Sequence, residues 1–351
     1  EISEWEGLCF NDENTHVTKV DWGIFEEDSE PIDQGKILLD WLPETVEHFS
    51  IDDRGFEGHL ECRKLPAKLK EFSAINNQLT GNITLADLPA DVERFEVSGN
   101  RLGGSVSLEN LPRNLSVLNL YNNYFSGKIV TSLENIKLQL VSLGQNEIEG
   151  SIDLTRLPPN LFDFGGEENN FYGSVDLSQL PASLKEINLQ KNQLNGTISL
   201  SCLPEGLIEL SLFENSFSGS IDLEHLPPTM KKMYLPRNRL SGKISLENLP
   251  PTLEVLSLRK NKLYGTLNLH NLPQSLKWLY LSTNAFHGNV DLTNLPPVLR
   301  RLWLNGNRLD GDITLTNLPR NMEELDLSDN VFDGTVRIGK IPRTLELFDI
   351  R

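Results

Sequence analysis

The residues that could carry catalytic or metal chemistry are few and scattered in this chain. Its six histidines share no spacing that would bring two of them onto one metal ion, and no Cys-x-x-Cys pair is present. No glycine-rich stretch matches a phosphate-binding loop, and no serine, histidine and acid form a recognisable triad. A solvated acidic surface explains the many Asp and Glu residues better than a catalytic pair does. We therefore expect a protein that is not an enzyme, with no metal site and no cofactor.

Binding chemistry is concentrated between residues 225 and 310. This stretch holds 12 Lys and Arg against 4 Asp and Glu, a net charge of +8, whereas the whole chain of 351 residues carries −18. Within it, Trp278 and Tyr280 alternate with Leu279 and Leu281, so in a strand the rings and the leucines face opposite sides. Trp, Tyr and Arg supply much of the energy of protein interfaces once a partner encloses them. These residue types therefore indicate recognition rather than catalysis.

The elements that position these residues come from an internal repeat. Leu-Pro recurs with proline at 43, 66, 89, 112, 158, 181, 204, 227, 250, 273, 296 and 319, each step being a multiple of 23 residues. Asn135 takes the one missing place and Ile341-Pro342 closes the series, which gives fourteen registers without an insertion or deletion. A fixed period of roughly 20 to 29 residues is typical of a solenoid, whose coils are stabilised by stacking on their neighbours.

Each coil is predicted to contain one strand followed by a set of turns. In "PPTLEVLSLRKNKLYGTLNLHNLP", Leu256 and Leu258 alternate as in a strand, and no stretch leaves room for a helix. The far side of the coil should therefore be extended or tightly turned, with little α-helix. Asparagine recurs every 23 residues from Asn77 to Asn330, and glycine does so from Gly58 to Gly334. We expect buried amides that tie neighbouring coils together, and turns with no room for a Cβ atom.

The repeat L-x-x-L-x-L-x-x-N-x-L/F-x-G-x-I/V-x-L-x-x-L-P resembles that of the leucine-rich repeat family, over roughly residues 17–351. Elements such as "LSGKI" and "LNGTI" look like the plant-type, extracellular subclass, and the 23-residue variant is most similar to leucine-rich repeat proteins of protists. The resemblance implies a right-handed solenoid with a parallel β-sheet on its concave face, an extended or 3-10 convex side, and a role in binding other proteins. It also implies a receptor-like ectodomain that is secreted or at the cell surface, while a cytoplasmic location stays open.

Two parts are expected along the chain. Residues 1–42 form an N-terminal cap and an irregular first repeat with an acidic insertion, "GIFEEDSEPIDQ", and residues 43–351 form fourteen 23-residue repeats. The last repeat is truncated and shows no C-terminal cap. "WEGLC" resembles a plant-type cap, which normally carries a second cysteine nearby. Either one bridge forms, between Cys9 and Cys62, or these two cysteines and Cys202 are all free thiols.

Other signals are weak. Three N-glycosylation sequons occur, at Asn82, Asn114 and Asn195, about as many as chance supplies in so asparagine-rich a chain. No targeting peptide is visible, and no apolar run is long enough to span a membrane. Residues 131–137 lose their leucines and Gly166 stands in a leucine column, which indicates either tolerated drift or a local bend or pocket.

The residues five, seven and nine places after each proline should face away from the core. In the seven-place column, small or polar residues fill the earlier repeats, and Tyr234, Tyr280 and Trp303 appear in the later ones. Together with the neighbouring columns they define the predicted ligand site: Phe213, Lys232, Tyr234, Arg259, Trp278, Tyr280, Arg301 and Trp303. A contiguous exposed aromatic patch marks an interaction site. The alternative is that the rings cover the leucine core, with Arg and Lys stems lying over them.

We therefore expect a module that binds a protein or peptide ligand on the concave face, between Lys232 and Trp303. The alternatives are a glycan or polyanion binder, and a scaffold that self-associates through its uncapped C-terminal edge or its oppositely charged halves. Residues 1–175 hold 31 acidic and 13 basic side chains, and residues 176–351 hold 19 of each. This acidic half disfavours long nucleic acid as a ligand.

Overall fold

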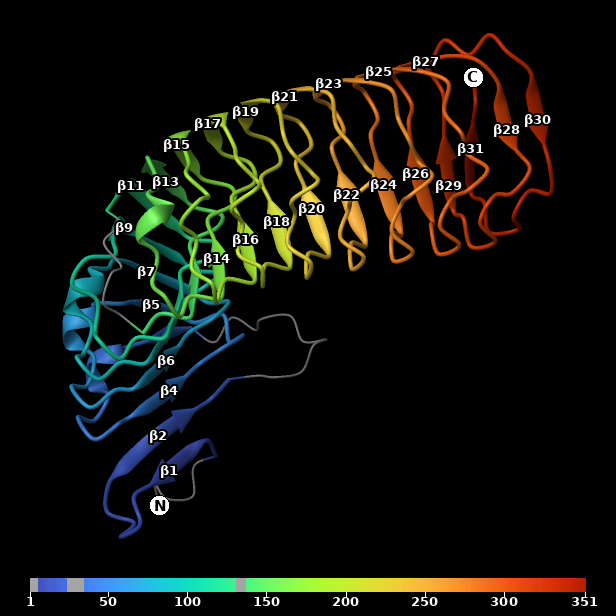
Figure 1. The fold of residues 1–351 in the computed structure, drawn as a ribbon. Coiled ribbons are helices and arrows are strands. Elements are labelled where there is room, and N and C mark those ends of the chain that lie inside the picture. Colours follow the sequence, from blue (N-terminus) through green and yellow to red (C-terminus); the bar gives the residue numbers. More distant parts are fainter. Residues whose placement is uncertain (1–5, 24–34, 131–136) are drawn as a thin grey trace. The chain divides into compact units, whose positions relative to one another are not determined.

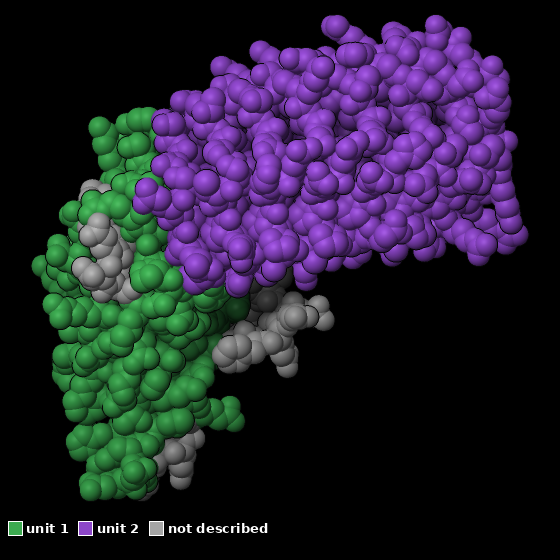
Figure 2. Space-filling view, viewed as in Figure 1, with its two compact units in different colours: residues 1–172 green, residues 173–351 purple. Residues whose placement is uncertain are grey.

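The computed structural model describes residues 6–23, 35–130 and 137–351. The chain divides into two compact units, Glu1–Tyr172 and Gly173–Arg351, which are coloured separately in Figure 2. This division differs from the predicted cap boundary at residue 42, which stays a prediction. The acidic insertion and the irregular stretch before residue 137 fall largely outside the described residues.

In the first unit, each coil contributes a strand to one main sheet (Figure 1). Its order is β1 (Leu8–Phe10), β2 (Val17–Asp21), β4 (His48–Ser50), β6 (Glu71–Ser73), β8 (Arg94–Glu96), β10 (Val117–Asn119), β12 (Leu140–Ser142) and β14 (Asp163–Gly165). β1 is antiparallel to β2, and the strands from β2 onward are parallel. The second strands of the coils form another sheet, ordered β3 (Lys36–Ile37), β5 (Glu57–His59), β7 (Gln78–Asn82), β9 (Arg101–Ser107), β11 (Tyr124–Val130), β13 (Glu147–Gly150) and β15 (Asn170–Ser174). The first three residues of β15 belong to this unit.

The second unit repeats this pattern. Its main sheet is ordered β16 (Glu186–Asn188), β18 (Glu209–Ser211), β20 (Lys232–Tyr234), β22 (Val255–Ser257), β24 (Trp278–Tyr280), β26 (Arg301–Trp303), β29 (Glu324–Asp326) and β31 (Leu347–Asp349). The other sheet contains β17 (Gln193–Thr197), β19 (Ser216–Gly219), β21 (Arg239–Gly242), β23 (Lys262–Gly265), β25 (Ala285–Gly288) and β27 (Arg308–Leu309). A separate pair, β28 (Ile313–Leu315) and β30 (Val336–Ile338), completes the unit.

The structure confirms the predicted solenoid of parallel strands. The helices of the described residues are short 3-10 turns: η2 (Leu39–Trp41), η3 (Cys62–Lys64), η4 (Leu85–Asp87) and η5 (Leu154–Arg156). In the part of the chain that is described, none of the helices has the length and apolar character needed to cross a membrane. Each Leu-Pro element also closes a tight turn, as where the Leu276 amide donates to the Pro273 carbonyl at 3.0 Å.

The core consists of stacked apolar columns. In the coil of β24, Leu276, Leu279, Leu281 and Phe286 are fully buried, and each has an equivalent in the neighbouring coils. A single coil has apolar side chains along both edges, so it buries them only when another coil stacks on each side. In the last coil, residues such as Ile338 and Phe348 remain 52% and 38% exposed.

Buried asparagines tie each coil to the coil before it, as predicted. The Phe217 amide donates to the Asn238 side-chain oxygen at 3.0 Å. The Asn238 amide group in turn donates to the carbonyls of Leu212, Leu235 and Pro236, at 3.0 to 3.3 Å. One buried amide thus forms hydrogen bonds with backbone groups of two coils and supplies the partner of the buried Phe217 amide.

The residue before each ladder asparagine adopts a left-handed conformation. Its φ lies between 52° and 67° in twelve coils, at positions 76, 99, 122, 145, 168, 191, 214, 237, 260, 283, 306 and 329. Asp53, at the equivalent place before Arg54, has a φ of 58°. Only some of these residues are Asn, Asp or Gly, the types that tolerate this region best. The repeated backbone therefore imposes the conformation on residues such as Lys260 and Thr283. The glycine column behaves as predicted at Gly81, where an added Cβ would lie 2.6 Å from the Leu60 carbonyl oxygen.

Candidate functional site

The strand face of the second unit carries half-buried aromatic rings at the predicted places. In β24, Leu279 is fully buried, whereas Trp278 and Tyr280 on either side are half-buried. This confirms the predicted alternation. Tyr280 pairs in register with Ser257 on one side and with Trp303 on the other. Ser257 is only 4% exposed, so this small side chain leaves a depression between the larger side chains on either side of it.

Five of the eight predicted ligand residues line one hollow of about 290 Å³. They are Phe213, Tyr234, Arg259, Tyr280 and Trp303. The lining is completed by four residues that the sequence analysis did not select, Glu214, Pro236, Arg237 and Ser257. We call this site the aromatic hollow. Of these four residues, Pro236 stands nine places after a repeat proline, and Glu214 and Arg237 stand ten places after one. A search of the sequence that included the first loop residue after each strand would therefore have found them.

Contacts within the chain fix the wall of the aromatic hollow. The Trp303 and Tyr280 rings meet edge to face, with centroids 4.8 Å apart and planes at 64°. The Trp303 indole nitrogen donates to Glu324 Oε2 at 2.8 Å, which sets the orientation of the ring. The wall is therefore formed before any ligand arrives.

Arg259 supplies the free cation of the aromatic hollow. Its guanidinium carbon lies 6.0 Å from the Trp303 ring centroid. Among the described residues, Arg259 forms no ion pair, whereas Arg237 at the rim pairs with Glu214 at 3.1 Å. An anionic group of a ligand would find the Arg259 guanidinium available for a charge-assisted hydrogen bond.

Both tyrosines of the aromatic hollow are held as neutral phenols. Burial raises the pKa of Tyr234, and burial also raises the pKa of Tyr280 although the neighbouring Arg301 opposes that rise. The rings therefore offer apolar faces and hydroxyl groups without negative charge near neutral pH.

The structure places the other three predicted residues outside the aromatic hollow, in contacts within the chain. The Arg301 guanidinium carbon lies 5.6 Å from the Trp278 ring centroid, and its Nε lies 3.4 Å from Glu324 Oε1. Lys232 pairs with Glu209 at 2.9 Å. For these three side chains, the contacts agree with the alternative interpretation, in which the aromatic and basic residues pack over the sheet and do not face a ligand.

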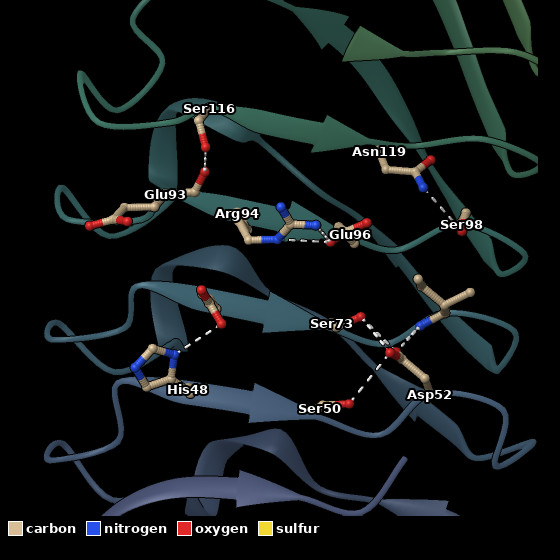
Figure 3. A network of polar contacts seen from close by, with 12 residues as sticks. His48, Ser50, Asp52, Ser73, Glu93, Arg94, Glu96, Ser98, Ser116 and Asn119 are labelled. Atoms are coloured by element: carbon tan, nitrogen blue, oxygen red, sulfur yellow. Dashed lines mark hydrogen bonds and ion pairs between the residues drawn. The ribbon is translucent and has the colours of Figure 1, made fainter. Parts of the chain in front are cut away.

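A network of polar contacts lies on the strand face of the first unit, as Figure 3 shows. Asp52 Oδ1 accepts hydrogen bonds from the Ser73 hydroxyl and the Ile75 amide, each at 2.7 Å. Burial raises the pKa of Asp52, and these hydrogen bonds counteract the rise. His48 contacts Glu71 at 3.0 Å. The described residues contain no group of three His, Cys, Asp or Glu side chains placed to hold a metal ion.

The remaining predicted sites are dispersed. Asn82 and Asn195 are exposed, and Asn114 is half-buried and accepts a hydrogen bond from Lys137 at 3.3 Å. All three cysteines are free thiols, the second of the two states left open by the sequence. Cys62 is buried in its leucine position, and this burial raises the pKa of its thiol to about 12.

Comparisons with known sequences show the repeat type. The family model described as Leucine Rich Repeat matches residues 114–136, the length of one repeat. A search of curated protein sequences finds no match to the chain.

Solved structures share the fold over nearly the whole chain. The plant peptide hormone receptor RGFR1 in complex with RGF2 matches 98% of this chain with a TM-score of 0.73 and 22% identity. The receptor kinase HAESA ectodomain of Arabidopsis, in complex with an IDA peptide hormone ligand, matches 97% with a TM-score of 0.67 and 21% identity. YopM from Yersinia enterocolitica matches 82% with a TM-score of 0.57 and 27% identity. This chain spans 60% of the RGFR1 chain, 74% of the HAESA chain and 61% of the YopM chain.

Proposed function

Since the chain is a leucine-rich repeat protein, we propose that it binds a protein or peptide ligand on its strand face, at the aromatic hollow of the second unit. The observation that carries the proposal is the convergence of four aromatic side chains and the unpaired Arg259 on one preformed hollow. The solenoid does not require these residues, because the same column holds Ser50, Asn119 and Ser211 in other coils.

The chemistry of the aromatic hollow selects its ligand. Its rings favour an apolar or aromatic side chain, and Arg259 favours a carboxylate beside it. A volume of about 290 Å³ accommodates one large side chain rather than a whole small domain. We therefore propose that a protein or peptide inserts one apolar anchor here and places an acidic side chain against Arg259.

The solved neighbours support binding rather than catalysis. RGFR1 and HAESA are both described as complexes with peptide ligands, and each matches nearly all of this chain. At 21 to 22% identity this likeness shows the fold alone, so peptide binding by this chain rests on the aromatic hollow itself.

Peptide selection tests the proposal without a known ligand. Random peptides displayed on phage would be selected on the wild-type chain and counter-selected on the Tyr280→Ala/Trp303→Ala double variant. We expect the enriched peptides to pair an acidic residue with an apolar one. Trp303→Ala should weaken their binding by about 30-fold or more, the effect of losing an interface hot spot of about 2 kcal/mol.

Tyr124→Ala is the matched control, because Tyr124 is 60% exposed and belongs to a different sheet of the first unit. Its affinity for the selected peptides should stay within about threefold of wild type, since surface residues outside an interface contribute little. Equal losses in both variants, or no enrichment over the double variant, would overturn the assignment to the aromatic hollow.

A further inference from the structure

A second charged surface lies beside the aromatic hollow, on the loop that leads from the main sheet to the other sheet. Arg237 and Arg239 flank the ladder residue Asn238, and Lys260 and Lys262 flank its equivalent in the next coil, Asn261. All four cationic side chains are exposed. The two coils are joined directly at this loop, where the Arg237 amide donates to the Arg259 carbonyl at 2.9 Å. We call these four residues the basic ridge.

At the other end of the main-sheet strands, away from this loop, the charged side chains are arranged differently. There, three cations each pair with an acid at the equivalent position of a neighbouring coil: Lys232 with Glu209 at 2.9 Å, Lys277 with Glu254 at 2.6 Å, and Arg300 with Glu323 at 3.1 Å. Lys277 and Arg300 are also equivalent positions of the same sign, but each has an acidic partner. In the basic ridge, equivalent positions repeat the same sign. Among the described residues, Arg237 alone of the four has an acidic partner, Glu214.

This repetition has an energetic cost. Arg237 and Lys260 occupy equivalent turns of neighbouring coils, and like charges on adjacent segments repel each other. Arg239 and Lys262 are not opposite each other, because the register of β21 and β23 places Lys262 opposite Ser241. The free energy of folding does not explain why cations stack here. A ligand that brings negative charges at a similar spacing would turn this repulsion into attraction.

We propose that the basic ridge binds a linear anionic polysaccharide. The four cations are exposed and lie in two consecutive coils, whereas a protein partner would require an apolar centre that desolvates on contact. Lys262 and Tyr264 are the exposed positions of β23, and Tyr264 is 46% exposed, so an aromatic face lies next to the cations for a sugar ring to pack on. Long nucleic acid is a poorer ligand, because the chain as a whole carries −18.

The basic ridge can be tested separately from the aromatic hollow, because Arg239, Lys260 and Lys262 do not line that hollow. A fluorescent heparin-derived dodecasaccharide would be titrated with the full chain at about 50 and about 200 mM NaCl, with fluorescence polarisation as the readout. For wild type we expect binding that weakens with salt, with a log–log slope of about −2 to −3 for the charges neutralised. Lys260→Glu/Lys262→Glu should lower the affinity at least tenfold and reduce the magnitude of the slope by about 2.

Lys68→Glu/Lys128→Glu makes the same change in net charge on exposed lysines of the first unit, and its affinity should stay close to wild type. Tyr280→Ala/Trp303→Ala should also retain binding, which separates this proposal from the peptide site. The proposal is overturned by absent binding of the wild-type chain at about 50 mM salt, or by equal losses in the ridge and control variants. Tighter binding of a single-stranded DNA 12-mer than of the sugar would likewise overturn the assignment to a polysaccharide.

Discussion

Tyr280 and Trp303 face solvent because strand geometry allows only one face of each strand to reach the core. Their neighbours Leu279 and Leu302 are fully buried, so the aromatic side chains point the other way. Trp278 obeys the same geometry, yet it packs against Arg301 and lies outside the aromatic hollow. The position in the repeat thus decides which side chains are exposed, and the contacts of each side chain decide which can meet a ligand.

At Cys62 the structure makes a prediction about thiol reactivity. Burial raises its pKa to about 12, so near pH 8 almost none of this thiol is thiolate, the form that attacks Ellman's reagent. Cys9 and Cys202 are exposed. We expect two thiols to react rapidly in the native chain and the third only after unfolding in urea. A Cys9–Cys62 disulfide would instead leave one reactive thiol both before and after unfolding without reductant, and Cys62→Ser identifies the slow one.

At Asp52 we expect a pH dependence of stability. Burial raises the pKa of this carboxyl in the folded chain, so the folded state binds its proton more readily than the unfolded state does. Its contribution to the free energy of unfolding is therefore largest below the unfolded pKa and is lost as the pH rises through the folded pKa. Asp52→Asn keeps the acceptor for Ser73 and Ile75 but cannot ionise.

Urea unfolding of Asp52→Asn and wild type between about pH 3.5 and 7 measures this effect. Wild type should lose stability relative to the variant as the pH rises. Asp87→Asn, at an exposed carboxyl, serves as the control. A constant difference between wild type and Asp52→Asn across this range would contradict the predicted sign.

At the scale of the coil, the loop between the two strands is the element on which the solenoid depends. It combines a residue in the left-handed region with a buried asparagine, as at Arg237 and Asn238. The Asn238 side chain accepts a hydrogen bond from the preceding coil and donates hydrogen bonds to carbonyls of that coil and of its own coil. The full set of hydrogen bonds of the loop therefore forms only when the preceding coil is in place. This explains why the left-handed position holds many residue types, whereas the next position is asparagine in the twelve coils from Asn77 to Asn330.

Asn238→Ala tests this dependence. The change leaves the buried Phe217 amide without its partner, and we expect it to lower the free energy of unfolding by about 1 to 3 kcal/mol. The carbonyls of Leu212, Leu235 and Pro236 lose one donor each but keep another, from Asn215, Asn261 and the Glu214 amide. Asn268→Ala, at an exposed amide of the same unit, should cost less than about 0.5 kcal/mol. Hydrogen exchange of the amides in β19 and β21 would localise the loss, and equal costs for the two variants would refute the role of the buried amide.

At the scale of the whole molecule, charge is divided unevenly between the two units. Residues 173–175 carry no charge, so the first unit holds 31 acidic and 13 basic side chains and the second holds 19 of each. The net charge of −18 therefore resides in the first unit, whereas the aromatic hollow and the basic ridge belong to the second. Repulsion among like charges destabilises a compact state, and salt screens it.

This asymmetry predicts different responses to salt. Raising NaCl from about 50 to about 500 mM should slow hydrogen exchange in the first unit more than in the second, because only the first carries a large net charge. Peptide-resolved mass spectrometry of the intact chain would compare the two units in the same sample, with an equal concentration of sucrose as a non-ionic control. A larger effect in the second unit would contradict the explanation.

The sequence by itself determined the solenoid, because a strict period of 23 places leucine, asparagine and glycine at equivalent positions of every coil, and stacking is the way in which such coils bury their apolar edges. It also determined which columns face away from the core, since side chains of a strand alternate. Only the tertiary structure decided which of the outward-facing residues line the aromatic hollow and which are engaged in contacts within the chain. Within the described part of the chain, Arg259 has no acidic partner, whereas Lys232 is paired with Glu209. Ion pairs and ring contacts form between residues of neighbouring coils, 23 positions apart, and depend on whether the side chains reach each other.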